Sequence, residues 1–264
     1  INCGGAGQPA CNNVQGNRQT TPTGFQLTIP FNFNPYNVYQ VPFERFNIYS
    51  AARFEISDAL EIYTRGLFSK NTVQTIIAPS GSFGRAVVLP LSNPLLTPAQ
   101  RNAFCAFDTN PGPGYTPTFS QATCDAAALA VGPADPRYRT VTTLISRRAL
   151  EAGPRVSTYI TNIFDYRIGA RGGITDSIEW DVFGSYGESD NVQTITGYLL
   201  NSRIDQSVLS TGVGAAATCQ NPANGCVLVN WFGPTGSITP EAVDFLTDSS
   251  TVTTRVSLAQ ARGT

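Results

Sequence analysis

Apolar and polar residues alternate with a period of two along residues 46–56, where Phe46, Ile48, Phe54 and Ile56 fall on one side. The alternation resumes over residues 60–69 after a short Ser-Asp-Ala break. A period of two is typical of a β-strand with two unlike faces, and a short polar break between two such runs indicates a tight turn. We therefore predict a β-hairpin over residues 46–70.

A second stretch repeats this pattern more than a hundred positions later. Residues 164–174 alternate, a Thr-Asp-Ser break follows, and the alternation resumes at Ile178. Both stretches end in the string Val-Gln-Thr-Ile, at residues 73–76 and 192–195. We predict a second hairpin over residues 158–200, as one hairpin repeated at long range rather than a solenoid repeat.

The connections between these strands differ strongly in length. The turns inside the hairpins are short, whereas residues 71–157 form a long Pro-rich connection and residues 201–264 follow as a loop region. Arms of about ten residues match tilted strands that cross a hydrocarbon core, and short turns on one side with long extracellular loops on the other are typical of outer-membrane β-barrels. A soluble β-sandwich predicts the same alternation, so the pattern alone leaves both architectures open.

Charged residues fall on one side of the alternating segments. In a barrel this side faces the aqueous lumen, and in a soluble sheet it faces water. The lumen-facing candidates are Arg53, Arg65, Asp165, Arg167, Arg171 and Asp181.

Six cysteines form three local pairs within loop-like stretches. They are Cys3 with Cys11, Cys105 with Cys124, and Cys219 with Cys226. Close pairs in loops indicate disulfides made in an oxidising compartment, although six cysteines allow fifteen connectivities. A zinc site is the competing interpretation, but the chain has no Cys-x-x-Cys motif and no histidine.

Composition narrows the class of protein further. The 264 residues are 41% hydrophobic and 13% charged with a net charge of −1, so no basic excess indicates a nucleic-acid partner. Histidine is absent, which removes the usual general base and metal ligand. We therefore expect neither an enzyme nor a cofactor or metal site. Methionine is absent too, so we expect a processed or excised product. The segment shows no signal peptide and no run of about 18 apolar residues, so we expect no membrane-spanning helix in it.

Three small clusters have both a functional and a structural interpretation. Glu188, Asp190 and Asn191 offer oxygen ligands for a calcium ion, but such charge runs are more often a solvated loop. Arg147, Arg148 and Arg155 offer an anion site, but pairing with acidic lumen residues is the favoured role. The aromatic residues Tyr159, Tyr166, Trp180 and Tyr186 fit a membrane-interface girdle, but aromatic residues are also common on strands.

Several blocks in a fixed order resemble the barrels of large-loop TonB-dependent outer-membrane receptors. The blocks cover about residues 25–250. They are Tyr36-Asn37-Val38-Tyr39-Gln40-Val41-Pro42-Phe43-Glu44-Arg45-Phe46-Asn47, Ala52-Arg53-Phe54-Glu55-Ile56, Arg147-Arg148, Glu151-Ala152-Gly153-Pro154-Arg155, Phe164-Asp165-Tyr166-Arg167 with Gly169, Trp180-Asp181-Val182, Val229-Asn230-Trp231-Phe232-Gly233-Pro234 and Gly236-Ser237-Ile238-Thr239-Pro240.

This resemblance implies an all-β fold whose antiparallel strands belong to a transmembrane barrel of about 22 strands around a plug. It implies uptake of a scarce nutrient, such as an iron chelate, a vitamin or an oligosaccharide, at the outer membrane. The partners would be membrane lipid, that ligand and the inner-membrane TonB complex. No plug is present in residues 1–264, so we interpret them as a partial barrel segment that does not transport alone.

Two other functions remain open for the isolated chain. Barrel strands without their neighbours expose ladder edges, and residues 73–78, 87–91 and 192–200 are β-prone and weakly charged. These features favour an extracellular cross-β fibril in which copies of the chain stack in register. The cysteine pairs alternatively favour a secreted, disulfide-stapled binding module.

Overall fold

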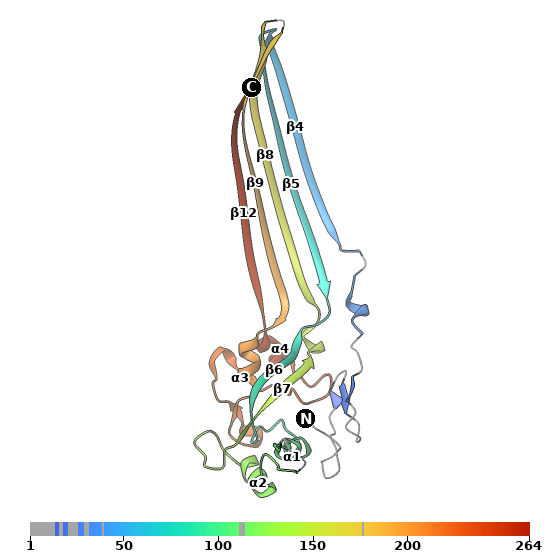
Figure 1. The fold of residues 1–264 in the computed structure, drawn as a ribbon, viewed down its shortest axis with the longest axis vertical. Helices are drawn as coiled ribbons and strands as arrows, with labels where there is room; N and C mark the ends of the chain where they lie inside the picture. The colour runs from blue at the N-terminus through green and yellow to red at the C-terminus, as the bar shows by residue number, and fades with distance from the viewer. Residues whose placement is uncertain are drawn as a thin grey trace. The chain divides into compact units, whose positions relative to one another are not determined.

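The computed structural model describes residues 14–15, 18–20, 26–28, 32–38, 40–110, 114–175 and 177–264 (Figure 1). The chain is mostly antiparallel β-sheet, with 52% of its residues in strands and 19% in helices. The prediction of an all-β chain is confirmed at this level. Over the residues described, the sheets do not close into a barrel.

The elements follow one another from three short N-terminal strands to a long C-terminal strand. The strands are β1 (Val14–Gln15), β2 (Arg18–Thr20), β3 (Gln26–Thr28), β4 (Phe43–Ser57), β5 (Leu60–Ile77), β6 (Gly81–Pro90), β7 (Thr140–Arg148), β8 (Arg155–Thr175), β9 (Ile178–Leu199), β10 (Ser210–Thr211), β11 (Thr218–Cys219) and β12 (Thr247–Gly263). The helices are η1 (Asn34–Tyr36), α1 (Pro98–Cys105), α2 (Gln121–Ala128), η2 (Leu150–Ala152), α3 (Asn201–Val208), η3 (Gly214–Ala216), η4 (Ala223–Gly225) and α4 (Pro240–Leu246).

The chain divides into two compact units. The strand unit consists of Val38–Ile77, Val156–Thr196 and Ser249–Thr264. The mixed unit takes in Ala78–Arg155, Gly197–Asp248 and the N-terminal stretch. None of the helices in the described part of the chain combines the length and hydropathy needed to cross a bilayer.

One five-stranded sheet makes up the strand unit, in the order β12-β9-β8-β5-β4 (Figure 1). In the first hairpin β4 pairs with β5 from Phe43 opposite Val73 to Ser57 opposite Leu60. The second hairpin pairs β8 with β9 from Val156 opposite Thr196 onwards. The two hairpins lie where the alternation predicts them, and their strands of 15 to 22 residues exceed the predicted ten.

The fifth strand differs from the expectation that residues 201–264 form a loop region. β12 pairs with the free side of β9, where Asp181 N–H donates to Thr264 O at 3.1 Å and Thr264 N–H donates to Asp181 O at 2.9 Å. The partner strand lies far away in the sequence, so no hairpin signal precedes β12. Residues 247–263 are therefore part of the sheet.

The mixed unit has a hydrophobic core of its own, although residues 71–157 were expected to form a long loop. That connection contains β6, α1, α2 and β7. Leu89 and Leu91 from it pack in one cluster with Ile204, Trp231 and Leu246 from the connection between β9 and β12. The two connections therefore fold together around a shared core.

Two of the predicted disulfides are confirmed. Cys105–Cys124 joins α1 to α2, and Cys219–Cys226 closes a short loop after α3. Cys105, Cys124 and Cys219 are buried. The predicted pair of Cys3 and Cys11 lies outside the described residues.

A buried ion pair holds the segment from Asn230 to Gly236, on both sides of Trp231. Arg147 Nη2 donates to Glu151 Oε1 at 2.7 Å, and Arg147 Nη1 donates to the carbonyl oxygens of Asn230 and Gly233 at 2.8 Å each. Glu151 Oε1 also accepts from the N–H of Gly236 at 2.7 Å. The expectation that Arg147 pairs with acidic lumen residues is therefore wrong: its carboxylate partner lies four residues along the chain, in the mixed unit.

Burial sets the protonation behaviour of this pair. Burial lowers the pKa of Arg147, and Glu151 partly offsets that effect. Burial raises the pKa of Glu151, but backbone N–H donors and Arg147 outweigh it, so the net pKa is lowered from 4.5. Because the pKa of Glu151 is lower in the folded chain, its carboxylate stabilises the fold fully above pH 4.5, and this contribution is lost as the pH falls from there through the lowered pKa of the folded chain.

Candidate functional site

The strand unit has two chemically different faces. In a β-strand successive side chains point to opposite faces, and cross-strand partners share a face. Arg167 is paired with Ser185 and Arg171 with Asp181, whereas Ile168 is paired with Gly184. We call the face that carries Arg167, Arg171 and Asp181 the polar face, and the face that carries Ile168 the apolar face.

Charged groups on the polar face form ion pairs between strands. Arg171 on β8 reaches Glu61 on β5 through an Nη2–Oε1 distance of 2.7 Å, and its Nε donates to the same oxygen at 2.9 Å. Arg65 on β5 lies 3.8 Å from Asp165 on β8. These groups are partly exposed, so each pair contributes little stability alone. Together they keep a hydrated, nearly neutral surface across the strands.

Tyr63 crosses from β5 over β8 to reach β9. Its hydroxyl donates to Asp181 Oδ1 at 2.7 Å. Gly169 on β8 lies beneath the tyrosine ring, since a Cβ atom at this glycine would be 2.5 Å from Tyr63 Cζ. Next to it, the Arg167 guanidinium lies over the Phe183 ring at 4.0 Å. The missing side chain of Gly169 therefore makes the bridge between β5 and β9 possible.

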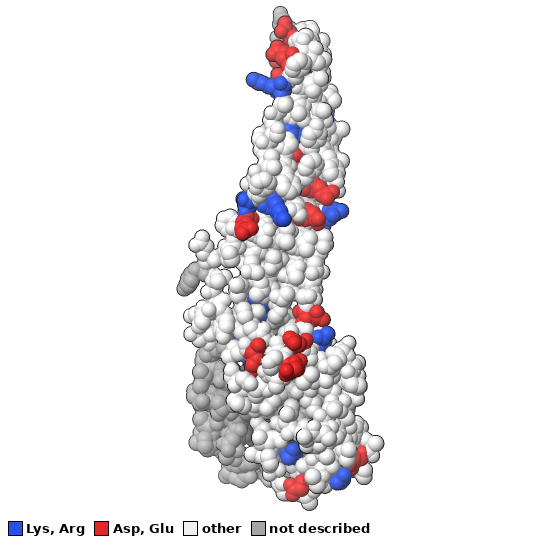
Figure 2. Space-filling view, turned by 180° about the vertical axis from the view of Figure 1, so that it is seen from behind, with Lys and Arg blue, Asp and Glu red and all other residues white. Residues whose placement is uncertain are grey.

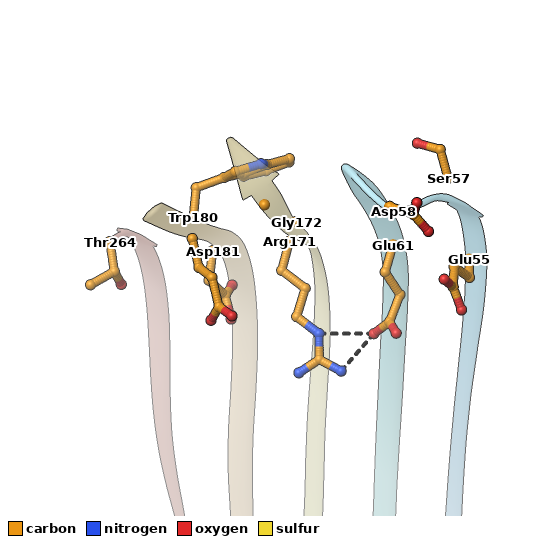
Figure 3. Close-up of a pocket in the computed structure, with 11 residues that line it drawn as sticks. Glu55, Ser57, Asp58, Glu61, Arg171, Gly172, Trp180, Asp181 and Thr264 are labelled. Carbon is orange, nitrogen blue, oxygen red and sulfur yellow. Dashed lines mark hydrogen bonds and ion pairs between the residues drawn. The ribbon is translucent and has the colours of Figure 1, made fainter. Parts of the chain in front are cut away.

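A hollow of ≈ 660 Å³ lies at the turn end of the sheet. Figure 3 shows Arg171 and Glu61 pointing toward one another across it, with Asp181 on the same side of the strands. Its charged lining residues are Glu55, Asp58, Glu61, Glu179, Asp181 and Arg171. The hollow is therefore acidic, with one guanidinium held between the strands.

The charged side chains of the strand unit form ion pairs with one another. Within the described residues, no group of three or more His, Cys, Asp or Glu side chains is placed to hold a metal ion. Glu188 and Asp190, considered above as calcium ligands, instead face Arg255 at 3.4 and 3.3 Å.

The apolar face exposes large side chains along most of both hairpins. These are Phe46, Ile48, Phe54, Ile56, Ile62, Phe68, Phe164, Tyr166, Ile168, Ile174, Ile178, Val182 and Tyr186. Apolar surfaces this extensive are unusual in monomeric soluble proteins, where they commonly mark binding surfaces.

At the end of the strands away from the turns, charged residues replace the large apolar side chains of the apolar face. Phe46 is paired with Lys70, and Phe164 with Glu188, so cationic and anionic groups follow directly after the last aromatic residues. On the side seen in Figure 2, charged atoms gather in separate patches with uncharged surface between them. The apolar face is therefore a band with a charged border.

The structure brings together most of the predicted lumen-facing residues. Arg65 and Asp165 form an ion pair, Arg171 and Asp181 line the hollow, and Arg167 lies between them on β8. Arg53 on β4 lies opposite Tyr63 on β5 and is exposed. Whether these residues line a lumen stays a prediction.

Three residues that shape the polar face were not singled out from the sequence. They are Glu61, Tyr63 and Gly169. Period two already places Glu61 and Tyr63 with Arg65, so the signal was present in the alternation. The contact of Gly169 with Tyr63 depends on how β5 lies beside β8, which no local pattern specifies.

The other two arginines of the predicted anion site donate hydrogen bonds to backbone carbonyl groups of the mixed unit. Arg148 Nη1 donates to Pro79 O at 2.7 Å, and Arg155 Nε donates to Ala78 O at 2.8 Å. Each guanidinium also lies over an aromatic ring, that of Phe83 or Tyr198.

Comparison with known proteins adds no relative. No family model, no curated protein and no solved structure matches the chain. The resemblance to TonB-dependent receptors therefore rests on the residue blocks alone.

Replacing Gly169 with alanine is expected to lower the free energy of unfolding by about 1–3 kcal/mol, because overpacking forces neighbouring side chains to move. The new Cβ displaces Tyr63, and the hydrogen bond to Asp181 is lost. Chemical denaturation in detergent measures the change. A Tyr63→Phe substitution should then add no further loss in the Gly169→Ala background, although it does in the native chain.

Gly173→Ala is the matched control for this prediction. Gly173 lies on the same strand, and its nearest neighbour to an added Cβ is Thr175 O at 3.7 Å, an ordinary contact distance. Equal losses for the two alanine variants would contradict the proposed role of Gly169.

Proposed function

We propose that this chain is part of the wall of a TonB-dependent outer-membrane receptor for a scarce nutrient, and that it has no enzymatic activity. The observation that carries the proposal is the exposed apolar band on long antiparallel strands, backed by a charged face. A barrel wall needs this combination, because one face meets lipid and the other meets water.

The dimensions of the band support this role. From Phe46 to Ile56 the apolar stretch of β4 spans about 34 Å at 3.4 Å per residue, and tilting by about 40° reduces its height to about 26 Å. An outward apolar band of outer-membrane barrels is about 25 Å tall. The strands continue beyond the band, so charged residues such as Lys70 lie where headgroups would be.

The lengths of the connections between strands also support a barrel wall, and they suggest how it is oriented in the membrane. The described turn between β4 and β5 is two residues long, while the connections at the other strand ends fold into the disulfide-braced mixed unit. Disulfides form in the periplasm or outside the cell rather than in the cytosol. In the proposal the mixed unit is extracellular, the turns face the periplasm, and the polar face with Arg171 and Asp181 faces the lumen.

The experiment uses the longest natural polypeptide that contains this sequence. We expect it in the outer-membrane fraction, and we expect its mobility in denaturing gels to change on boiling, as for a folded barrel. A freely soluble protein whose mobility does not change on heating would refute the proposal. Growth on single iron chelates, vitamins and oligosaccharides then identifies the nutrient.

We propose a self-assembled fibril as the second candidate for the isolated chain. It is favoured by the long exposed strands β4 and β12 at the two ends of the sheet. Val87 and Leu89 of the predicted stacking segments are buried in the mixed unit, so stacking there would require that unit to unfold. A repeat of about 4.8 Å along a filament identifies this state, and discrete particles without the repeat exclude it.

A further inference from the structure

The polar face of the strand unit is charged near the turns and almost uncharged farther from them. Towards the turns it holds ion pairs such as that of Arg65 with Asp165. Beyond this pair, no polar-face position carries a charged side chain in residues 69–77 of β5, 157–163 of β8, 187–195 of β9 and 250–258 of β12. These four strands are neighbours in the sheet (Figure 1). We call this part of the polar face the neutral zone; Arg45 on β4 lies at its border, opposite Asn71.

Amide and hydroxyl side chains of the neutral zone bond to one another across β8 and β9. Asn191 Nδ2 donates to Thr161 Oγ1 at 2.7 Å, and Gln193 Nε2 donates to the Tyr159 hydroxyl at 3.1 Å. All four side chains are half-buried. An amide nitrogen has a second hydrogen, and a hydroxyl that accepts one bond can still donate another. The neutral zone therefore offers further donors and acceptors on side chains that are already held in place.

Strand β12 adds apolar side chains to the same face. Arg255 forms ion pairs with Glu188 and Asp190, which belong to the opposite face of β9. Because side chains alternate along a strand, the even-numbered residues of β12 on either side of Arg255 lie on the polar face. The large exposed aliphatic residues of the neutral zone are Val252, Val256, Leu258 and Ile163. An apolar stripe thus lies next to the amide and hydroxyl groups, on the face that otherwise carries the charges.

This mixture of side chains matches the chemistry of a sugar. A sugar ring has hydroxyl groups around its edge and C–H groups on its two faces. Ligand sites commonly combine apolar and aromatic walls with a few placed hydroxyl and amide groups. We propose that the neutral zone binds an uncharged oligosaccharide. Asn191, Gln193 and Thr161 then bond to sugar hydroxyls, and the ring of Tyr159 with Val256 packs against the C–H faces.

The absence of charge in the neutral zone argues against an anionic ligand there. Chelates that hold iron through carboxylate or catecholate groups carry negative charge, and proteins bind such groups with arginine or lysine. The nearest arginines on β5 and β8 are Arg65, which is paired with Asp165, and Arg167, which lies over the Phe183 ring. Both lie towards the turns.

The proposal rests on the barrel-wall function and names the nutrient class for it. In the proposed orientation the turns face the periplasm, so the neutral zone lies in the extracellular half of the lumen wall. A nutrient that enters from outside meets this half first. Of the iron chelates, vitamins and oligosaccharides considered above, the neutral zone fits the oligosaccharides.

Calorimetric titration in mild detergent tests the ligand class on the longest natural polypeptide that contains this sequence. The probes are linear hexasaccharides of glucose, xylose and mannose, together with ferric citrate and cyanocobalamin. We expect saturable binding of at least one hexasaccharide and none of ferric citrate or cyanocobalamin. A polypeptide that binds none of the hexasaccharides overturns the proposal.

Alanine variants test whether the neutral zone is the binding site. Gln193→Ala and Tyr159→Ala are each expected to weaken hexasaccharide binding about tenfold, because each removes a contact to the sugar. Tyr159→Phe keeps the ring and should lose less than Tyr159→Ala. Asn162→Ala is the matched control: Asn162 also carries an amide on β8, but it lies on the apolar face opposite Asp190, so binding should not change.

The change of gel mobility on boiling shows that each variant still folds. Folded variants at Gln193 and Tyr159 that bind as tightly as the native protein overturn the assignment of the site, as does an equal loss for Asn162→Ala. The same gel separates this proposal from the barrel-wall function. A polypeptide with the mobility change of a barrel but without hexasaccharide binding refutes the oligosaccharide proposal alone, whereas a soluble polypeptide without that change refutes the barrel wall.

Discussion

Replacing Arg147 with methionine is expected to lower the free energy of unfolding of the mixed unit by about 3–5 kcal/mol. The Arg147 side chain is only 5% exposed and bonds to Glu151 and to the carbonyl oxygens of Asn230, Gly233 and Pro234. Methionine fills a similar volume without any donor. Glu151 would then remain as a buried charge with no cation, and the carbonyl groups of Asn230, Gly233 and Pro234 would lose the donors that Arg147 supplies.

Urea unfolding followed by tryptophan fluorescence measures this loss. Of the two tryptophans, Trp231 is buried in the core of the mixed unit and Trp180 lies in the strand unit. A Trp180→Phe background therefore leaves a signal from the mixed unit alone.

Two variants separate the buried ion pair from a general effect of losing charge. Arg139→Met removes an exposed arginine whose hydrogen bonds within the described residues go to the nearby carbonyl groups of Pro136 and Tyr138, so the midpoint should hardly change. Glu151→Gln keeps an oxygen that accepts from Gly236 and should cost less than Arg147→Met. If Arg147→Met is no more destabilising than Arg139→Met, the anchoring role of Arg147 is wrong.

Replacing Ile168 with arginine is expected to destabilise the protein by about 2–4 kcal/mol in a lipid bilayer. Ile168 is 50% exposed and lies midway along the apolar stretch of β8, between Phe164 and Ile174. In the proposed barrel wall this position contacts lipid near the middle of the membrane, where a guanidinium is costly. In water the same exposed side chain would tolerate the change.

The matched control is Tyr49→Arg on the opposite face of the sheet. Tyr49 is 65% exposed and is paired with Leu67 rather than with a charged residue. Reversible folding of the full-length protein into vesicles gives the free energy of each variant. The proposal requires a large loss for Ile168→Arg and a small one for Tyr49→Arg. Similar losses for both would mean that the apolar face does not face lipid.

The two hairpins could be predicted because their information is local. In each hairpin the alternation of apolar and polar residues shows which residues share a face, and a break of three residues marks the turn between the strands. The cysteine pairs Cys105–Cys124 and Cys219–Cys226 are likewise close in sequence, so their spacing was sufficient. Strand lengths were underestimated, because the alternation weakens beyond the apolar band where β5 and β9 become polar.

Long-range pairing explains what the sequence did not reveal. β12 is rich in Ser and Thr, and its partner β9 precedes it by almost 50 residues, so only the spacing of Val252, Val256 and Leu258 gave a signal. Val87, Leu89 and Leu91 belong to one core cluster with Trp231 and Ile204, but an apolar run looks the same in a core strand and in a stacking segment.

The sequence predicted which charged residues share the polar face, but it did not predict which ion pairs they form. Period two placed Arg65, Arg171 and Asp181 on one side, as observed. It did not reveal which carboxylate each arginine meets, since that depends on the register between hairpins. Arg171 meets Glu61 and Arg65 meets Asp165 across the two central strands.

The shared core of the mixed unit restricts how this chain can change in evolution. Residues 78–155 and 197–248 belong to different connections, yet Leu89 and Leu91 from one pack in the same cluster as Trp231 and Leu246 from the other. Deleting or exchanging either connection alone would remove apolar contacts that the other connection makes in the shared core. The two segments must therefore be inherited and recombined together, unlike surface loops that vary independently of one another.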